Sequence, residues 1–198
     1  QPAAPVVEPW DTLSQLSKEK EVVGMFISGH PMDDFALEIK SFCSEGGLSL
    51  LQDMETNKNR ELKLSGMVTD VQEKIARASN KPFGTFKMED YDNSFEFILF
   101  GEDYLKYRHL LQKGSFLFLV GRIQPKRFGA DADKALEFKI NRLEPLFEIR
   151  EKMARYLNIS IELNSITNEF VETISSTLPN GNGKTTVRFK VRDAEGTE

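Results

Sequence analysis

The sequence predicts a mixed α/β chain with a helical N-terminal segment, a five-stranded β-barrel and a small, partial β-α-β domain. Five runs between Leu62 and Leu143 carry apolar residues at every second position. They are Leu62–Val71, Phe83–Met88, Phe95–Phe100, Phe116–Ile123 and Ala135–Ile140. One helical segment, Glu102–Leu111, separates the third run from the fourth, and after Pro145 the apolar period becomes that of a helix.

The five runs predict a specific barrel. Alternation such as Phe95, Phe97 and Leu99 turns one face of a strand to a core and the other to solvent or a ligand. Five strands with a helix after the third is the order of the OB-fold, a partly open barrel that binds mainly single-stranded nucleic acids or oligosaccharides. The pattern therefore indicates a binding module, with boundaries near residues 59–145.

The segment before the barrel is predicted to be helical over residues 10–58, after a Pro-rich linker at 1–9. Asp11 can cap a helix that runs over Thr12–Val23, and Gly24 is its stop signal. Pro31 suits the first turn of a second helix that ends near Phe42. The chain starts without Met and without the basic and apolar parts of a signal peptide, so we expect a piece of a longer protein.

The segment after the barrel, residues 146–198, is predicted to be a partial α/β domain that docks a partner. A helical stretch at Leu146–Tyr156 precedes a strand at Ile159–Leu163. Ser165 is expected to cap a helix over Ile166–Leu178, and a last strand follows at Thr185–Val191. Two strands and a helix bury little surface alone, so we expect this domain to be truncated or to lean on the barrel.

Composition excludes several classes of protein. No apolar run approaches the roughly 20 residues that span a bilayer. One cysteine, Cys43, permits no intrachain disulfide, which fits a reducing cytoplasm. Besides Cys43, the chain has only two histidines, His30 and His109, and no second Cys or His has the spacing of a zinc ligand. The net charge is −5, but residues 61–144 hold 14 Lys and Arg against 13 Asp and Glu, so nucleic-acid binding would rest on local, salt-sensitive patches.

Two loops are predicted to flank a nucleic-acid groove across the second and third strands. The loop at residues 73–82 carries three cations, and the loop at 124–130 carries two cations and an aromatic residue. Between them the groove could present Phe83, Phe86, Lys87, Phe95 and Phe97, although alternation places part of this set in the core. The predicted nucleic-acid-binding residues are Lys74, Arg77, Lys81, Phe86, Lys87, Lys126, Arg127 and Phe128. Phe128 is the best candidate for base stacking, since it lies in a loop between Arg127 and Gly129.

No motif predicts a catalytic or metal site, and no cofactor is expected. The string Gly181-Asn182-Gly183-Lys184-Thr185 resembles a phosphate loop, but that motif requires glycine at the position of Leu178 and a helix after the lysine. Acidic pairs at Asp33-Asp34 and Glu102-Asp103 sit at expected helix starts, where negative charge is favourable. The acidic residues at 89–92 form an expected turn between strands. His30, in a turn before Pro31, is expected to pack or cap.

The string Leu16–Asp33, which includes Ser28-Gly29-His30-Pro31, resembles a signature of the alpha subunit of bacterial DNA polymerase III. The strings Gly84–Asp90, Phe95–Phe100 and Val120-Gly121-Arg122-Ile123 keep that family's spacing, and the resemblance covers about residues 10–192. It implies a non-catalytic C-terminal region of a DNA-directed DNA polymerase, a nucleotidyltransferase of the cytoplasm, whose OB domain lies near the single-stranded template. The catalytic aspartates and their Mg²⁺ would lie upstream of this chain. The partners implied in the parent complex are the tau subunit of the clamp loader and the sliding clamp.

Three hypotheses remain open from the sequence. The favoured one is template contact by a polymerase region that also holds partner subunits. The alternative is a pure protein-interaction scaffold in which the barrel touches no nucleic acid. A third is an anticodon-binding module like those of some aminoacyl-tRNA synthetases, which would prefer RNA. An autonomous enzyme is the hypothesis that the sequence favours least.

Overall fold

The computed structural model describes residues 10–24, 26–76, 80–126, 135–178 and 184–193. The chain divides into two compact units, residues 1–149 and 150–198, and each is described by itself. None of the helices in these ranges is both long and apolar enough to cross a membrane.

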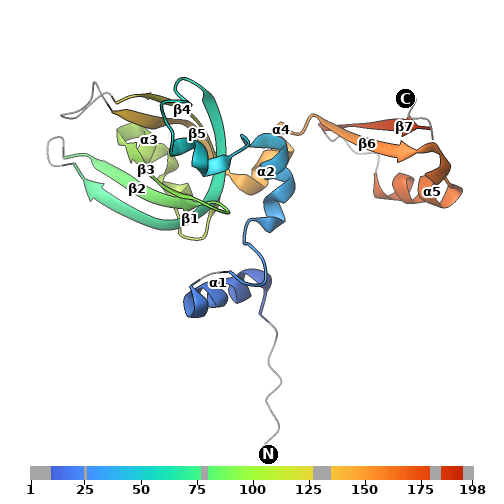
Figure 1. The fold of residues 1–198 in the computed structure, drawn as a ribbon, viewed down its shortest axis with the longest axis horizontal. Coiled ribbons are helices and arrows are strands. Elements are labelled where there is room, and N and C mark those ends of the chain that lie inside the picture. The colour runs from blue at the N-terminus through green and yellow to red at the C-terminus, as the bar shows by residue number, and fades with distance from the viewer. Residues whose placement is uncertain (1–9, 25, 77–79, 127–134, 179–183, 194–198) are drawn as a thin grey trace, which may run out of the picture. The chain divides into compact units, whose positions relative to one another are not determined.

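The first unit contains the predicted five-stranded barrel. Its antiparallel sheet has the order β3-β2-β1-β4-β5 (Figure 1). The strands are β1 (Glu61–Ile75), β2 (Pro82–Glu89), β3 (Ser94–Phe100), β4 (Phe116–Pro125) and β5 (Leu136–Pro145). The first half of β1 pairs with β4 and the second half with β2, with a register shift between Val68 and Asp70. A bulge of this kind increases local twist, which lets one strand serve two sides of a barrel.

The helix between the third and fourth strands is present, as predicted. It comprises α3 (Gly101–Tyr107) and the 3₁₀ turn η3 (Arg108–Leu110). Tyr104 and Tyr107 of α3 are buried in the barrel core. A Cβ atom on Gly84 would lie 2.4 Å from Cε2 of Tyr104, so the helix packs where β2 has no side chain. The mixed α/β fold with its OB-like barrel is confirmed.

The N-terminal segment begins as predicted. In α1 (Thr12–Val23) the carboxylate of Asp11 accepts a hydrogen bond from the Ser14 amide, and Gly24 ends the helix with a φ of 84°. The second predicted helix is shorter than expected, because the residues after Pro31 form a 3₁₀ turn, η1 (Asp33–Phe35), before α2 (Ala36–Phe42). A further turn, η2 (Gly47–Leu51), contributes buried leucines to the barrel core.

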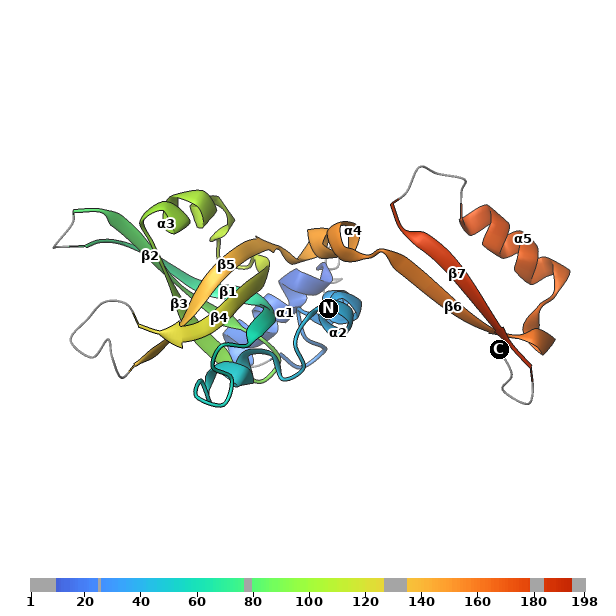
Figure 2. The ribbon, with the colours of Figure 1, turned by 90° about the horizontal axis from the view of Figure 1, so that it is seen from above.

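The chain leaves the barrel through η4 (Leu146–Glu148) and α4 (Ile149–Met153), and the second unit is the predicted β-α-β piece (Figure 2). Its parallel strands are β6 (Tyr156–Glu162) and β7 (Thr186–Arg192), joined through η5 (Leu163–Ser165) and α5 (Asn168–Thr177). The predicted cap is wrong by two residues. Thr167 rather than Ser165 accepts the hydrogen bond from the Phe170 amide, because Ser165 is still part of the preceding 3₁₀ turn.

Candidate nucleic-acid interface

The solvent face of β1, β2 and β3 is set by strand alternation. In β2, Phe86 and Met88 point into the core and are 1% and 0% exposed, whereas Lys87 between them is exposed. In β3 the core side chains are Phe97 and Leu99. The outward-facing positions of β2 and β3 are therefore Phe83, Thr85, Lys87, Glu89, Ser94, Glu96, Ile98 and Phe100, although Thr85 is itself buried.

An exposed aromatic cluster stands at one end of this face. Phe83 and Phe100 face each other across the β2–β3 pairing, with ring centroids 5.3 Å apart and planes inclined by 27°. Phe100 is 59% exposed and Ile98, one pair along on β3, is 48% exposed. Lys74 of β1 stands opposite Phe83 on the other side of β2. We call these four residues, Lys74, Phe83, Ile98 and Phe100, the Phe100 cluster. Exposed rings beside a cation are the elements of a base-stacking site.

The other end of the face is acidic. Lys87 pairs across the strands with Asp70 on one side and Glu96 on the other. Its Nζ also lies 3.3 Å from Glu89, which forms a 2.7 Å ion pair with Lys20. Partial burial acts to raise the pKa of Glu89, but the hydrogen bonds and charges of Lys20 and Lys87 outweigh it and hold that pKa below its ordinary value. Negative charge here disfavours the binding of a phosphate backbone at this end of the face.

The predicted loop cations are partly described. Lys74, Lys81, Lys87 and Lys126 are exposed. The strand ends next to the β1–β2 and β4–β5 connections lie at the same end of the barrel in Figures 1 and 2, which is also the end that carries Phe83. Three of the predicted residues, Arg77, Arg127 and Phe128, lie outside the described residues.

One predicted contact is wrong. Phe86 is 1% exposed and stacks on Phe97 within the core, with centroids 5.3 Å apart, so no base can reach it. Phe97 is also buried, and Phe95 packs against the core from its edge. The physical reason is the two-residue period of a strand, because Phe86 and Lys87 are neighbours and cannot share a face.

The sequence reasoning missed Phe100 and Ile98. A signal for them was present in β3, where the polar residues Ser94 and Glu96 identify the outward set. Ile98 and Phe100 continue that set at the same period.

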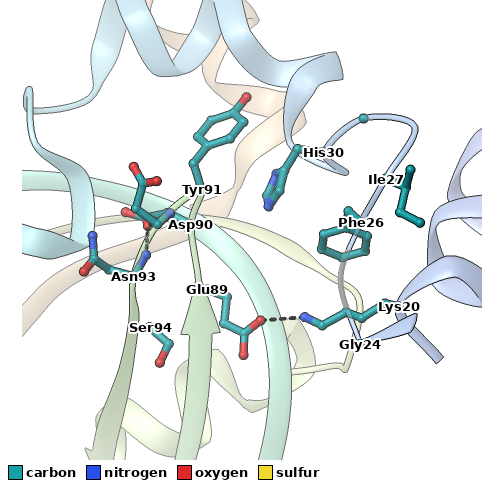
Figure 3. Close-up of a pocket in the computed structure, with 12 residues that line it drawn as sticks. Lys20, Gly24, Phe26, Ile27, His30, Glu89, Asp90, Tyr91, Asn93 and Ser94 are labelled. Carbon is teal, nitrogen blue, oxygen red and sulfur yellow. Dashed lines mark hydrogen bonds and ion pairs between the residues drawn. The ribbon is translucent and has the colours of Figure 1, made fainter. Parts of the chain in front are cut away.

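A hollow lies beside His30, between Gly24, residues 26–30 and the turn that joins β2 to β3 (Figure 3). It has a volume of about 600 Å³. The centroid of the His30 ring lies 4.5 Å from that of Tyr91 and 5.2 Å from that of Phe26. The Nδ1 atom of His30 accepts a hydrogen bond from the Met32 amide. Burial lowers the pKa of His30, and burial with the hydrogen bond to Asp33 raises the pKa of Tyr91 to about 12. These contacts attach the N-terminal segment to the barrel, in agreement with the packing role expected for His30.

Two of the acidic residues noted in the sequence, Asp33 and Asp90, have structural partners. The Asp90 carboxylate accepts hydrogen bonds from the amides of Leu48 and Asn93, and Asp33 accepts one from the amide of His30. Within the described ranges no group of three or more His, Cys, Asp or Glu residues could hold a metal ion.

Comparison with known proteins gives two family matches. Residues 62–146 match the family model described as an OB-fold nucleic acid binding domain. Residues 157–198 match the DNA polymerase III alpha subunit, C-terminal domain. The first match lies over the predicted barrel, and the second lies within the segment that follows it.

Individual relatives cover almost the whole chain. DNA polymerase III subunit alpha of Borreliella burgdorferi is 28% identical over 180 residues, which are 90% of this chain and 15% of that protein. The subunit of Escherichia coli (strain K12) is 25% identical over 189 residues, which are 95% of this chain and 16% of that protein. The chain thus spans only 15 to 16% of the length of these relatives.

Among solved structures, the asparaginyl-tRNA synthetase of Entamoeba histolytica matches this chain at 13% sequence identity. The match covers 47% of this chain and 23% of the synthetase chain. Its TM-score of 0.32 is too low to support an argument about fold or function. The sequence relatives are the informative ones. They show that the chain is similar over nearly its whole length to the DNA polymerase III alpha subunit, with a match to an OB-fold nucleic acid binding domain followed by a match to that subunit's C-terminal domain.

Proposed function

We propose that this chain is a non-catalytic region of a bacterial replicative polymerase and that its barrel contacts single-stranded template DNA. The observation that carries the proposal is the Phe100 cluster, in which the exposed ring of Phe100 stacks on the half-buried ring of Phe83 beside Lys74 on the face of β1–β3. The OB-fold family match supports nucleic acid as the ligand of that barrel.

The chemistry of the proposed contact combines stacking with weak electrostatics. An unpaired base can stack on the outward ring of Phe100, and such a contact contributes roughly 1–3 kcal/mol per base. Lys74, Lys81 and Lys126 add positive potential at the same end of the barrel. Asp70 and Glu96 disfavour phosphate at the opposite end, so the strand is directed to the Phe100 cluster.

The partners in the parent complex belong to the same proposal. The match of residues 157–198 to the family's C-terminal domain supports a role of the second unit in subunit contacts, with tau of the clamp loader as its partner and the sliding clamp elsewhere in the assembly. Polymerase chemistry and its Mg²⁺ would reside in other parts of a longer cytoplasmic protein. This chain, given a primed template and nucleotides, is expected to extend no primer.

Fluorescence anisotropy of a labelled oligo-dT at low salt tests the template contact. Phe100→Ala should weaken binding by roughly tenfold or more, since each 1.4 kcal/mol of lost stacking is a factor of ten. Phe147→Ala is the matched control, because Phe147 is 66% exposed in η4 and lies outside the sheet face. It should leave the affinity unchanged.

The same titration separates the competing functions. If the unaltered chain shows no binding at high micromolar concentrations, the scaffold function replaces template contact. A clear preference for an RNA oligonucleotide of the same length would favour the anticodon-binding module. Equal losses in Phe100→Ala and Phe147→Ala would reject the Phe100 cluster as the contact surface.

A further inference from the structure

The strand β6 has one backbone edge without a partner strand. Its sheet holds only β6 and β7 among the described residues, so each of these strands is paired on one side alone. The helix α5 lies over a face of the sheet in Figure 1 and on the β7 side of it in Figure 2. The outer edge of β6 therefore presents the N–H and C=O groups of alternate residues along a seven-residue strand. A row of such groups is a template for pairing with another strand.

The side chains of β7 protect its edge, whereas those of β6 do not. Arg188, Lys190 and Arg192 alternate along β7, and charged side chains, especially lysine, are a common means of preventing an edge from pairing. In β6 the residues from Tyr156 to Ile161 include no charged residue and no proline. The β6–β7 ladder also runs without a register shift, so no bulge twists the β6 edge away from a partner. The β6 edge is therefore the one that can accept a strand.

The sequence of β6 is complementary to itself in the antiparallel direction. If a second copy of the strand is placed alongside with Ile159 opposite Ile159, residues at equal distances from this centre face each other. The resulting pairs are Asn158 with Ser160, Leu157 with Ile161, and Tyr156 with Glu162.

Each of these pairs is chemically compatible. Leu157 and Ile161 are apolar and share one face of the strand with Ile159. On the other face an amide stands opposite a hydroxyl, and a phenol stands opposite a carboxylate to which it can donate a hydrogen bond. No pair places like charges opposite each other, which would destabilise the ladder.

Pairing through β6 would also cover apolar surface and produce a closed assembly. Leu157 is exposed and Ile159 and Ile161 are half-buried, so a second strand beside them removes apolar area from water. The product is a four-stranded sheet in the order β7-β6-β6-β7, and sheets of three or more strands with an apolar face are far more stable than a two-stranded one. The charged β7 strands would form both outer edges, so the assembly stops at two copies.

We propose that two copies of this chain associate through β6, whose strands pair antiparallel about a two-fold axis at Ile159. The self-complementary edge favours a second copy over an unrelated strand, because the same seven residues supply both sides of a symmetric interface. The dimer does not depend on the nucleic-acid contact of the barrel, and either can exist without the other.

Sedimentation equilibrium of the whole chain tests the dimer. The mass should rise from 22.6 kDa toward twice that value as the concentration increases from micromolar to millimolar. Leu157→Glu places a carboxylate opposite Ile161 and should raise the dissociation constant at least tenfold. Phe189→Glu is the matched control, because Phe189 is on β7 and is 47% exposed, as Leu157 is. A chain that stays monomeric at millimolar concentration, or an equal loss in both variants, would overturn the proposal and leave the edge to a strand of another protein.

Cross-linking tests the register without a charge in the sheet. In a Cys43→Ser background, chains carrying Asn158→Cys are mixed with chains carrying Ser160→Cys and oxidised. Directly opposed residues have Cβ atoms about 4.5–5.5 Å apart, whereas diagonal neighbours are about 7–8 Å apart, so the mixture should form disulfide-linked dimers faster than either chain alone. Equal rates in the mixture and in the separate chains would refute pairing about Ile159, even if the chain dimerises through another surface.

Discussion

At the scale of single residues, Phe86 and Phe100 show how position on a strand decides the role of the same side chain. Phe86 is 1% exposed and stacked on Phe97, and Phe100 is 59% exposed and stacked on Phe83. Both make an aromatic pair, but only one pair can be reached by a ligand. The chemical identity of the residue therefore carries no information about which role it has.

This difference predicts opposite results for two truncations. Phe86→Ala should lower the free energy of unfolding by about 3–5 kcal/mol, because it removes a buried ring and leaves a cavity. Phe100→Ala should change it by no more than about 0.5 kcal/mol, as is usual for exposed positions. Urea denaturation followed by circular dichroism measures both. Similar losses of stability in the two variants would mean that the two faces of β2 and β3 have been assigned wrongly.

Glu19 is the residue whose ionisation the structure perturbs most clearly. It accepts hydrogen bonds from the Ser28 hydroxyl, from the amides of Ser28 and Ile27, and from Gln15. These bonds, with the Ser28 hydroxyl first, lower the pKa of Glu19 from 4.5 to about 2. Because the folded pKa is depressed, this contribution to stability is complete above about pH 4.5 and is lost as the pH falls toward 2.

The titration of the Glu19 carboxyl carbon by NMR should therefore have its midpoint near pH 2. Ser28→Ala should move the midpoint upward toward 4.5, since it removes the largest cause of the shift. Ser17→Ala, an exposed serine on the same helix, should leave it in place. A midpoint near 4.5 in the unaltered chain would show that the segment around Ser28 is not held against α1 in solution.

The sequence predicts that the face of β2 and β3 carries aromatics, but not which ones. In each of the two strands phenylalanines occur at both sets of alternate positions, so hydrophobicity alone cannot tell which of them face the core. They are Phe83 and Phe86 in one strand and Phe95, Phe97 and Phe100 in the other. Polar residues at alternate positions supply the missing information, as Ser94 and Glu96 do in β3. The contacts of Phe83 with Phe100 also depend on strand register, which no single strand encodes.

At the scale of elements, the close approach of β4 and β5 depends on Gly121. It lies at the register shift of this pairing, and a Cβ atom there would be 2.4 Å from the carbonyl oxygen of Lys139 and 2.5 Å from Cζ of Phe138. The carbonyl belongs to a paired strand, so it cannot retreat without disturbing the ladder. Glycine is thus required by space at this position.

Gly121→Ala should accordingly lower the free energy of unfolding by roughly 1–3 kcal/mol, the usual range for overpacking. Gly29→Ala is the control, because the nearest atom to its added Cβ, Oδ2 of Asp33, lies at 3.4 Å, an ordinary contact. That control should stay within about 0.5 kcal/mol of the unaltered chain. Chemical denaturation of the two variants compares them directly, and equal stabilities would argue against the tight β4–β5 crossing.

The order and type of the elements follow from the sequence, but their ends do not. Alternation and turn residues correctly predict five strands and a helix after the third. However, β1 extends to Ile75, through residues assigned to a loop, and β5 extends to Pro145. In both strands the extra residues are held by pairing with a neighbouring strand, Ile75 with Pro82 and Pro145 with Leu117. Local patterns do not contain that information.

At the scale of the whole molecule, the two units differ in how much they bury. The barrel has a continuous core that includes Leu62, Val68, Phe86, Leu119 and Ile140. In the second unit, by contrast, no residue of the ranges 150–178 and 184–193 is fully buried. A two-stranded sheet with one helix has little hydrophobic surface to stabilise it. The second unit should therefore open at a lower free energy than the barrel does.

Native-state hydrogen exchange followed by mass spectrometry checks this difference. Peptides from β6 and β7 should exchange by local opening, orders of magnitude faster than peptides from β1 and β4, which should exchange only when the whole barrel unfolds. Urea at low concentration should accelerate exchange in β1 and β4 more than in β6 and β7, since global unfolding exposes more surface. If β6 and β7 exchange as slowly as β1, the second unit draws stability from contacts beyond its own small core. In that case its exposed apolar side chains, such as Leu157 and Phe189, would be covered in solution.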